Sequence, residues 1–294
     1  MTRSGFVALA GRPNVGKSTF VNAVVGEKVA IVSEKPQTTR RAIRGVRERG
    51  DVQLVLVDLP GVQRPRDALT ARMARRVQQE LDGADAALLM INGEQGVGPG
   101  DRFIAGRLAG AATPAVIAVN KADRLSREAL LETLAHAGEL ELDAEVFPIS
   151  ARTGAGVEEL IAHLAAMLPE GPFMFARETA SDQPEHLIVA ELIREAAIRR
   201  TFHEVPHAVE VVVEEIAQPE RGGVTRVRAL IWVETSSQKG ILIGSGGNMI
   251  KNIGIAARKE IEAALGGPVH LELSVRVRRD WRADEGLLDR LGIS

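Results

Sequence analysis

The sequence predicts two domains of different class: an N-terminal α/β domain, with a mostly parallel sheet covered by helices on both faces, and a C-terminal α+β domain. Up to about residue 168, apolar runs alternate with helix-like runs, and near-continuous apolar runs are typical of buried parallel strands. The alternation stops after residue 172, and 294 residues are enough for two cores. We expect a first domain over 1–172, a linker over 173–184 and a second domain over 185–294.

Composition limits the class of protein. Hydrophobic residues make up 45% of the chain and charged residues 26%, which favours packed domains over disorder. The absence of Cys excludes disulfides and cysteine zinc sites and fits a reducing compartment. The longest apolar stretches, such as 86–91, are too short to span a bilayer, and no signal peptide is evident, so we expect a cytoplasmic protein.

Net charge gives no sign of a nucleic-acid partner. The chain carries a formal charge of −2. From residue 176 onward, 16 Lys and Arg residues stand against 18 Asp and Glu residues. Any binding of RNA must therefore depend on a local arrangement of charges.

The expected strands of the first domain share an apolar composition and lie at 6–10, 53–57, 86–91, 115–119 and 146–149. In an open α/β sheet, ligands bind beyond the carboxyl ends of the strands. Polar motifs follow several of these strands directly. The sequence therefore predicts a ligand site at that edge of the sheet.

A glycine-rich motif follows the first strand and precedes a helix-like run over 19–25. It fits the pattern G-x-x-x-x-G-K-[ST] and consists of Gly11, Arg12, Pro13, Asn14, Val15, Gly16, Lys17, Ser18 and Thr19. Its backbone N–H groups can surround phosphates at a helix N-terminus, where the helix dipole favours negative charge. Lys17 can reach the β- and γ-phosphates, and the Ser18 hydroxyl can bind Mg²⁺. The motif predicts a nucleotide site.

The strand over 53–57 leads into Asp58, Leu59, Pro60 and Gly61. The Asp58 carboxylate can hold Mg²⁺, directly or through water, and the Gly61 N–H can meet a γ-phosphate. Alone, such a sequence is an ordinary turn. Its position after a second strand favours the nucleotide role.

The strand over 115–119 leads into Asn120, Lys121, Ala122 and Asp123. A carboxylate here can accept two hydrogen bonds from guanine, whereas adenine offers no such pair of donors, so Asp123 would select guanine. The alternative for Asp123 is a helix N-cap. Ser150 and Ala151 follow the last strand, and the Ala151 N–H can contact the guanine O6.

The segment over 33–40 is polar and without periodicity. Thr39 can complete Mg²⁺ coordination when a γ-phosphate is present, which would make this segment a switch. The alternative is a solvated loop, and both interpretations stay open. A series of arginines next to it is expected on a solvated strand face, with a ribosomal contact as the alternative: Arg40, Arg41, Arg44, Arg47 and Arg49.

In order and spacing, these motifs resemble the five motifs of translation-factor-class GTPases. The resemblance implies GTP, GDP and Mg²⁺ as ligands. It assigns the metal to Ser18, Thr39 and Asp58, and the chemistry at the γ-phosphate to Lys17, Thr39 and Gly61. The nucleotide contacts would come from the glycine-rich motif and from Asp58, Leu59, Pro60, Gly61, Asn120, Lys121, Asp123, Ser150 and Ala151.

Asn14, with Val62 just after Gly61, resembles a subgroup of these GTPases in which a catalytic glutamine is replaced. In that subgroup a potassium ion near the glycine-rich motif takes up charge. The resemblance implies a K⁺ site at Asn14. It also implies slow hydrolysis that K⁺ or a partner stimulates.

The C-terminal part reads as helix, strand, strand, helix, helix, strand. The first helix carries an apolar face over 188–197, and a hairpin over 208–216 and 225–234 follows. A short apolar turn over 240–243 and the sequence Gly-Ser-Gly-Gly precede the next helix, and the final strand over 269–277 alternates. The alternation predicts a half-buried sheet.

This order, with G-x-x-G between adjacent helices, resembles a KH domain of the second topological type. Such domains bind a single strand of about four nucleotides. By itself, G-x-x-G is also an ordinary turn between helices. The loop has no charge between its glycines, so attraction for phosphate would depend on lysines nearby. The implied RNA-binding residues are Lys239, Ile243, Gly244, Ser245, Gly246, Gly247 and Lys251.

A GTPase domain followed by a type-II KH domain is similar to the bacterial Era GTPases over nearly the whole chain. Besides the glycine-rich motif, the similar segments lie at 36–40, 220–223, 254–259 and 268–273. The resemblance implies an α/β P-loop GTPase domain followed by an α+β type-II KH domain. It implies an assembly factor for the 30S ribosomal subunit that binds 16S rRNA near its 3′ end.

Members of the family are also found at the inner face of the cell membrane, although this chain has no lipidation motif or strongly basic amphipathic helix that would predict it. We expect a monomer. GTP would order the segment around Thr39 and so change RNA affinity by linkage. Two other functions stay open: a nucleotide-gated scaffold that hardly hydrolyses GTP, and an ATP-dependent kinase, against which Asp123 argues.

Overall fold

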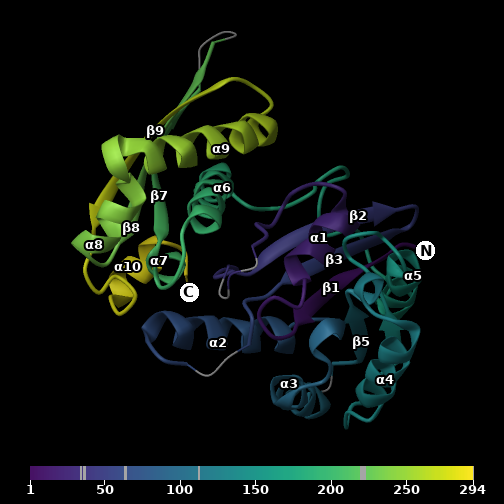
Figure 1. Ribbon diagram of the computed structural model, residues 1–294. Helices are drawn as coiled ribbons and strands as arrows, with labels where there is room; N and C mark the ends of the chain where they lie inside the picture. The colour runs from purple at the N-terminus through teal and green to yellow at the C-terminus, as the bar shows by residue number, and fades with distance from the viewer. Residues whose placement is uncertain (34, 36–37, 63–64, 112, 219–222, 294) are drawn as a thin grey trace. The chain divides into compact units, whose positions relative to one another are not determined.

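The computed structural model describes residues 1–33, 35, 38–62, 65–111, 113–218 and 223–293 (Figure 1). Two compact units make up the chain. The first consists of Met1–Ala30, Thr39–Asp182 and Ile293–Ser294, and the second of Ile31–Thr38 and Gln183–Gly292. A short early segment is therefore part of the second unit. Several residues used in the family resemblance lie outside the described residues: Pro36, Gln37, Glu220, Arg221 and Gly222.

The first unit is built on a six-stranded sheet in the order β2-β3-β1-β4-β5-β6. Its strands are β1 (Arg3–Ala10), β2 (Ile43–Arg49), β3 (Val52–Asp58), β4 (Ala86–Asn92), β5 (Ala115–Asn120) and β6 (Val146–Pro148). All neighbouring strands are parallel except β2 and β3, which are antiparallel. The five predicted strands and the mostly parallel sheet are confirmed, and β2 adds an antiparallel edge.

Helices cover both faces of this sheet (Figure 1). They are α1 (Lys17–Val25), α2 (Ala68–Asp82), α3 (Pro99–Ala109), α4 (Arg127–Gly138) and α5 (Val157–Met167), with short 3₁₀ turns η1 (Gly93–Gln95) and η2 (Ala122–Arg124). Successive side chains of one strand enter different cores: Leu88 packs with Phe20 and Leu160, whereas Leu89 packs with Ile104 and Leu108. Burial on both faces explains why the strands are apolar throughout.

The stretch predicted as a linker follows the sheet of the first unit for much of its length. The Val46 N–H of β2 donates to the Ala180 carbonyl at 2.8 Å. The fully buried Gln53 side chain accepts hydrogen bonds from the N–H groups of Met174 and Phe175 at 2.8 and 2.9 Å. These contacts explain why the first unit extends to Asp182.

The arginines predicted on a solvated face of β2 behave in two ways. Arg47 and Arg49 both pair with Glu158, at 3.0 and 2.7 Å. Arg40 is only 2% exposed, so the prediction of a solvated side chain is wrong for this residue. Because β2 begins at Ile43, the alternation of the strand does not apply to Arg40.

The second unit has the predicted order of helices and strands, with two short helices in addition. Its elements are α6 (Glu185–Arg200), α7 (Val205–Ala208), β7 (Glu210–Ala217), β8 (Thr225–Val233), α8 (Ser236–Ile243), η3 (Ser245–Gly247), α9 (Asn248–Leu265), β9 (Val269–Val277) and α10 (Glu285–Arg290). The sheet order is β7-β8-β9. Strands β7 and β8 are antiparallel, and β8 and β9 are parallel. The predicted apolar turn over 240–243 is the last turn of α8.

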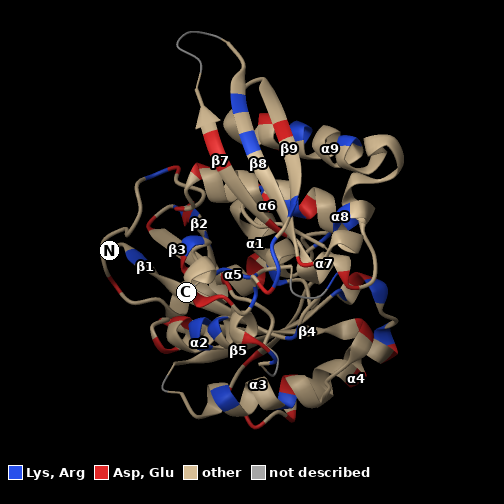
Figure 2. Ribbon diagram, turned by 90° about the vertical axis from the view of Figure 1, so that its left-hand side faces the viewer, with Lys and Arg blue, Asp and Glu red and all other residues tan. Residues whose placement is uncertain are grey.

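One apolar core joins α6, α8 and α9 to the three strands of this sheet. It contains Val189 and Ile193 of α6, Ala257 of α9 and Ala229 and Ile231 of β8, among others. Basic and acidic residues both occur along the strands (Figure 2). The predicted alternation of the final strand is confirmed, because its even-numbered residues from 270 to 276 are exposed. None of the helices in the described ranges combines the length and the apolar character that a membrane-spanning segment needs.

Candidate functional site: a nucleotide site and an RNA groove

The glycine-rich motif joins β1 to α1 as a loop with three positions of positive φ, the first of them Gly11 at 155°. Asn14 has a φ of 63°, and Gly16, at the N-cap of α1, has a φ of 102°. No side chain in the described part of the chain caps α1, so its first N–H groups are available to an anion. The Lys17 Nζ lies across the loop and donates to the carbonyls of Gly11 and Arg12, at 3.2 Å each.

Three oxygen-bearing side chains from separate segments converge beside Lys17. The Ser18 hydroxyl donates to Oδ2 of Asp58 at 2.5 Å, and the Thr39 hydroxyl donates to the same oxygen at 3.4 Å. The two hydroxyl oxygens are 3.1 Å apart. Oδ1 of Asp58 is buried and accepts no hydrogen bond from any described residue. Mg²⁺ prefers such hydroxyl and carboxylate oxygens, and the unsatisfied oxygen fits a cation.

Burial shapes the charges at this cluster. It raises the pKa of the Asp58 carboxyl, against the opposing effect of Lys17. It lowers the pKa of the Lys17 ammonium, against the opposing effect of Asp58. Each group has lost hydration that phosphates and a metal ion can replace.

The loop after Asp58 packs tightly on the glycine-rich motif. A Cβ on Gly61 would lie 2.8 Å from Cγ of Pro13 and 2.9 Å from its backbone nitrogen. The Val62 N–H donates to the Gly11 carbonyl at 3.2 Å. The Leu59 side chain is buried in the core of the sheet, so this residue can offer a nucleotide only its backbone.

Asn120 connects the two loops that border the predicted base site. Its Nδ2 donates to the Val15 carbonyl at 2.8 Å, and its Oδ1 accepts from the Ala151 N–H at 2.9 Å. A Cβ on Gly16 would lie 2.2 Å from Nδ2 of Asn120, so only glycine fits there. The Ala151 N–H, which we predicted to meet guanine, is thus engaged by Asn120 in this structure.

Asp123 presents a carboxylate beside the same loop. It accepts hydrogen bonds from the Ser150 hydroxyl at 2.6 Å and from Nη2 of Arg152 at 2.7 Å. The bond from Ser150 is the main reason that the pKa of Asp123 is lowered, and Arg152 adds to it. Asp123 is not a helix cap, because Ser126 caps α4. The N-cap alternative is therefore excluded for α4.

Two of the predicted nucleotide-binding residues have acidic partners that the sequence analysis did not identify. Arg12 turns its guanidinium to the buried Asp101 of α3, with Nε 2.9 Å from Oδ2. Lys121 pairs with Glu94 of η1 at 3.1 Å. The only sequence signal was the place of Asp101 three residues after Gly98, where an acidic side chain can cap α3.

The G-x-x-G sequence forms the predicted connection between α8 and α9. Gly244, Gly246 and Gly247 have φ values of 71°, 57° and 78°, in the left-handed region that favours glycine. A Cβ on Gly244 would lie 2.7 Å from Cβ of Met249. Ser245 and Gly246 are exposed. The loop therefore offers backbone at the surface.

A cavity of about 350 Å³ lies between α9 and β9. Its lining combines apolar and basic side chains: Ile250, Lys251, Gly254, Ile255, Arg258, His270, Leu271 and Leu273. Of the predicted RNA-binding residues, Lys251 lines it, whereas Ile243 packs against the core. Arg258 and His270 were not predicted. Positions 251, 254, 255 and 258 share one face of α9, so helical periodicity could have found Arg258.

The G-x-x-G loop and this cavity together form what we call the KH groove. Acidic side chains lie near two of its residues, because Arg258 is 3.8 Å from Glu262 and His270 is 3.3 Å from Glu272. A lining that combines apolar side chains with Lys251 and Arg258 suits the bases and phosphates of a single strand.

Comparisons with known proteins match both parts of the chain. A family model described as a 50S ribosome-binding GTPase matches residues 6–121, and one described as a KH domain matches residues 204–282. The GTPase Era of Alkaliphilus metalliredigens is 41% identical over 290 residues, covering 99% of this chain and 98% of the relative. The GTPase Era of Mycobacterium avium is 45% identical over 294 residues, covering 99% and 98%.

Two solved structures are similar over the full length of both chains. One is Era in complex with MgGDPNP and nucleotides 1506–1542 of 16S ribosomal RNA, with a TM-score of 0.95 and 35% identity. The other, an Aquifex aeolicus Era variant bound to GDP and AlF4⁻, has the same TM-score and identity. Identity above 40% over nearly the whole chain, together with these matches, shows that this chain belongs to the Era family of GTPases.

Proposed function

We propose that this chain binds and hydrolyses GTP, binds 16S rRNA near its 3′ end, and acts as an assembly and maturation factor for the 30S ribosomal subunit. The observation that carries the proposal is the convergence of Ser18, Thr39 and Asp58 beside Lys17, in a chain that also has a KH groove. The relative solved with MgGDPNP and a 16S rRNA segment supports the pairing of these two ligands.

The residues of the site account for binding and charge stabilisation. Bound Mg²⁺ would supply positive charge to the phosphates, held by Ser18, Thr39 and Asp58. Lys17 would exchange its two carbonyl partners for phosphate oxygens and stabilise the charge of the transferring group. The Gly61 N–H would donate to the γ-phosphate. Lys17→Ala should abolish nucleotide binding, and retained GTP affinity would rule out this site.

The proposed base site selects guanine through the Asp123 carboxylate. Competition between ATP and GTP for the protein separates this function from the ATP-dependent kinase. We expect GTP, and not ATP, to displace a labelled guanine nucleotide. Displacement by both nucleotides at similar concentrations would contradict the role of Asp123.

We propose a K⁺ ion at Asn14 as part of the same site. The left-handed backbone of Asn14 shapes the loop where the family resemblance puts the ion. GTP hydrolysis should be faster in K⁺ than in Na⁺ at equal ionic strength, and Asn14→Ala should remove the difference. Equal rates of the unchanged protein in the two salts would rule out this role.

A nucleotide-gated scaffold with little hydrolysis is the second candidate function. It is favoured by Val62, an apolar side chain where a catalytic glutamine would orient the attacking water. Multiple-turnover hydrolysis, measured in K⁺ with the RNA or 30S subunits present, separates the two. Repeated turnover supports the GTPase, and a single slow turnover supports the scaffold.

RNA binding is tested with a labelled single strand that matches the 3′ end of 16S rRNA. Its affinity is compared in GDPNP, GDP and nucleotide-free protein at one salt concentration. Ser245→Asp should weaken binding in every state, because it puts a carboxylate where phosphate should lie. This variant is sharper than Gly244→Asp, since Gly244 is left-handed and a Cβ there would meet Met249. Unchanged affinity in Ser245→Asp would exclude the loop as a phosphate contact.

Binding to the 30S subunit, a peripheral fraction at the inner membrane face and a monomeric state complete the proposal, and they rest on the family resemblance. Co-sedimentation with purified 30S subunits in GDPNP tests the first. Flotation with anionic vesicles tests the second, and light scattering of the pure protein tests the third. Protein that stays free of subunits in every nucleotide state would contradict the assembly role.

A further inference from the structure

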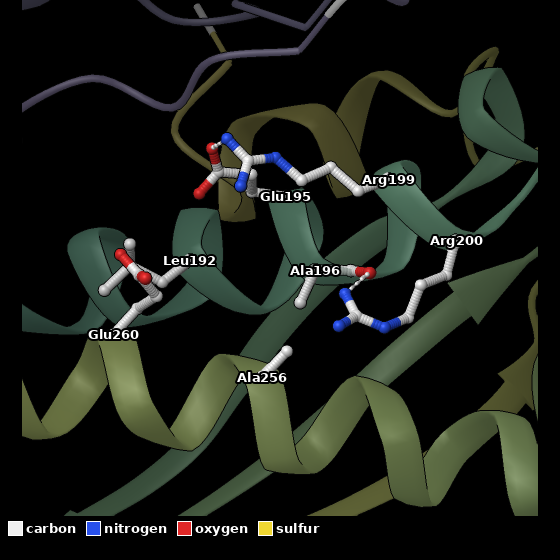
Figure 3. Close-up of a pocket in the computed structure, with 7 residues that line it drawn as sticks. All are labelled: Leu192, Glu195, Ala196, Arg199, Arg200, Ala256 and Glu260. Atoms are coloured by element: carbon white, nitrogen blue, oxygen red, sulfur yellow. Dashed lines mark hydrogen bonds and ion pairs between the residues drawn. The ribbon is translucent and has the colours of Figure 1, made fainter.

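The segment Ile31–Thr38 is held at its beginning by two side chains of α6. The Val32 N–H donates to Oε1 of Glu195 at 3.1 Å. The Val32 carbonyl accepts from Nη2 of Arg199, also at 3.1 Å. Glu195 and Arg199 pair with each other at 2.8 Å, one turn apart on the helix (Figure 3). The backbone of Val32 is thus bound on both its donor and its acceptor.

The same helix holds the segment at its end. Nη2 of Arg194 donates to the carbonyl of Thr38. Arg194 also pairs with Glu191 through two bonds, at 3.0 and 2.5 Å. Between the two ends, the Lys35 ammonium lies 4.7 Å from the ring centre of Phe202, just beyond α6. The contact with an aromatic ring adds to the attachment.

Arg194 stands out because it is a fully buried cation. Burial alone would lower its pKa, but Glu191, Glu210 and Glu195 outweigh that effect and raise it, so the guanidinium stays charged. Its Nη1 is buried and has no hydrogen-bond partner among the described residues. Buried ion clusters contribute little net stability, and their best-attested use is to specify one arrangement. Here the arrangement specified is the position of the Thr38 carbonyl.

The peptide bond after Thr38 leads directly to Thr39. The Thr39 hydroxyl is the member of the magnesium cluster that comes from the switch segment, 3.1 Å from the Ser18 hydroxyl. A displacement of the Thr38 carbonyl therefore moves Thr39 as well. The hydrogen bond from Arg194 to the Thr38 carbonyl therefore acts on the residue that precedes Thr39 in the chain.

Helix α6 is also the neighbour of α9, which carries the KH groove. A cavity of about 380 Å³ lies between the two helices, lined by Glu195, Arg199 and Arg200 of α6 and by Ala256 and Glu260 of α9 (Figure 3). Ala256 follows Ile255, which lines the KH groove, and α6 and α9 share one apolar core. This core therefore connects α9, which carries the groove, to the helix that holds Val32 and Thr38.

We propose that Glu195 and Arg194 are positioning residues for Thr39: by holding both ends of Ile31–Thr38, α6 sets whether Thr39 can join Mg²⁺ and the γ-phosphate. The inference rests on the proposed function, in which Thr39 binds Mg²⁺ only with the triphosphate. Loss of the grip should weaken binding of the triphosphate and spare that of the diphosphate. If RNA binding moves α9 and α6, it must by linkage also change the affinity for GTP.

The test measures affinities of the full-length protein for Mg²⁺·GDPNP and Mg²⁺·GDP with fluorescent nucleotides. Glu195→Ala removes the acceptor for the Val32 N–H. We expect the ratio of GDPNP to GDP affinity to fall about five-fold or more, with GDP affinity within two-fold of the unchanged protein. Glu195→Gln keeps an acceptor oxygen and should restore most of the ratio. A loss in Glu195→Gln as large as in Glu195→Ala would overturn the role of this hydrogen bond.

Arg200→Gln is the matched control. Arg200 lies on the same helix and lines the same cavity, but its guanidinium donates to the Ala196 carbonyl of α6 itself (Figure 3). The ratio of GDPNP to GDP affinity of Arg200→Gln should equal that of the unchanged protein. Arg194→Leu, if this variant folds, should lower the ratio of GDPNP to GDP affinity further. If it does not fold, Glu195→Ala still tests the positioning role, because Glu195 contacts the other end of the segment.

The outcomes separate this inference from the proposed function. If the unchanged protein binds GDPNP and GDP with the same Mg²⁺ dependence, the assignment of Thr39 to the metal fails. If the unchanged protein discriminates between them and Glu195→Ala does so equally, the positioning role of α6 is overturned and the metal site stands. A fall in melting temperature alone, with the affinity ratio unchanged, also overturns it.

Discussion

The guanidinium of Arg12 lies 2.9 Å from a carboxylate oxygen of Asp101, and Asp101 is fully buried. The pair links the nucleotide-binding loop to the N-terminus of α3. Arg12 also donates to the Gly96 carbonyl at 3.1 Å, and the Asp101 carboxylate accepts from the Gly98 N–H at 2.9 Å. The side chain of Arg12 therefore has a structural task, although its motif predicted a nucleotide contact.

Asp101→Ala should destabilise the first unit and loosen the nucleotide site. It leaves a half-buried guanidinium without its carboxylate and removes a cap, so we expect a loss of about 2 kcal/mol or more in the free energy of unfolding. Chemical denaturation measures it, and the GDP dissociation rate should rise. Arg102→Gln, an exposed neighbour, serves as the control. A stability equal to that of the unchanged protein would show that the pair contributes nothing.

Asp123→Asn should change the base that the protein prefers. The substitution replaces one acceptor oxygen by a donor, which opposes the guanine amine but suits the carbonyl of xanthine at the same position. We expect GTP affinity to fall at least about ten-fold and xanthosine triphosphate to bind better than GTP. Competition against a fluorescent nucleotide measures both affinities. An unchanged order of preference would place the base elsewhere.

Asp58→Asn should raise the Mg²⁺ concentration that nucleotide binding requires. The carboxylate accepts from Ser18 and Thr39, and its other oxygen is unsatisfied, so an amide removes charge from the centre of the cluster. A shift of about ten-fold or more in a Mg²⁺ titration is expected, larger with GDPNP than with GDP. Asp51→Asn, an exposed residue before β3, is the control. Identical titrations of Asp58→Asn and Asp51→Asn would exclude Asp58 as a metal ligand.

Arg258→Gln should weaken RNA binding through lost phosphate attraction. Removing one phosphate contact should make the slope of log affinity against log salt less negative by about 0.7. Lys259→Gln is a matched control, because Lys259 is the next residue of α9 and is exposed but does not line the KH groove. Equal losses in the two variants would indicate general electrostatic attraction in place of a groove contact.

The fold could be predicted from the sequence where the determinants are local. Motifs such as Gly11–Ser18 combine the residue types of a tight turn with those of phosphate binding, so the strand before and the helix after could be placed. The edge strand β2 was expected only as a strand face carrying arginines and without bounds, because its arginines obscure the apolar pattern. The alternation of β9 predicted its exposed face.

The parts of the site that escaped prediction depend on contacts across the chain. Asp101 meets Arg12 from 89 residues away, and Glu195 meets Val32 from 163 residues away. Neither partner carries a local pattern that identifies the other. The same holds for Arg40, which looked solvated beside other arginines and is buried. Long-range pairing of polar groups is decided by the topology and not by periodicity.

The membership of Ile31–Thr38 in the second unit has a consequence for recombination between relatives. Exchanging the C-terminal halves of two such proteins at the linker near Asp182 would leave Val32 and Thr38 facing the α6 of another chain. Residues 31–38 and α6 should therefore be inherited as a pair. A working chimera would have to carry the donor's segment 31–38 along with its C-terminal half, even though about 150 residues of chain separate the two.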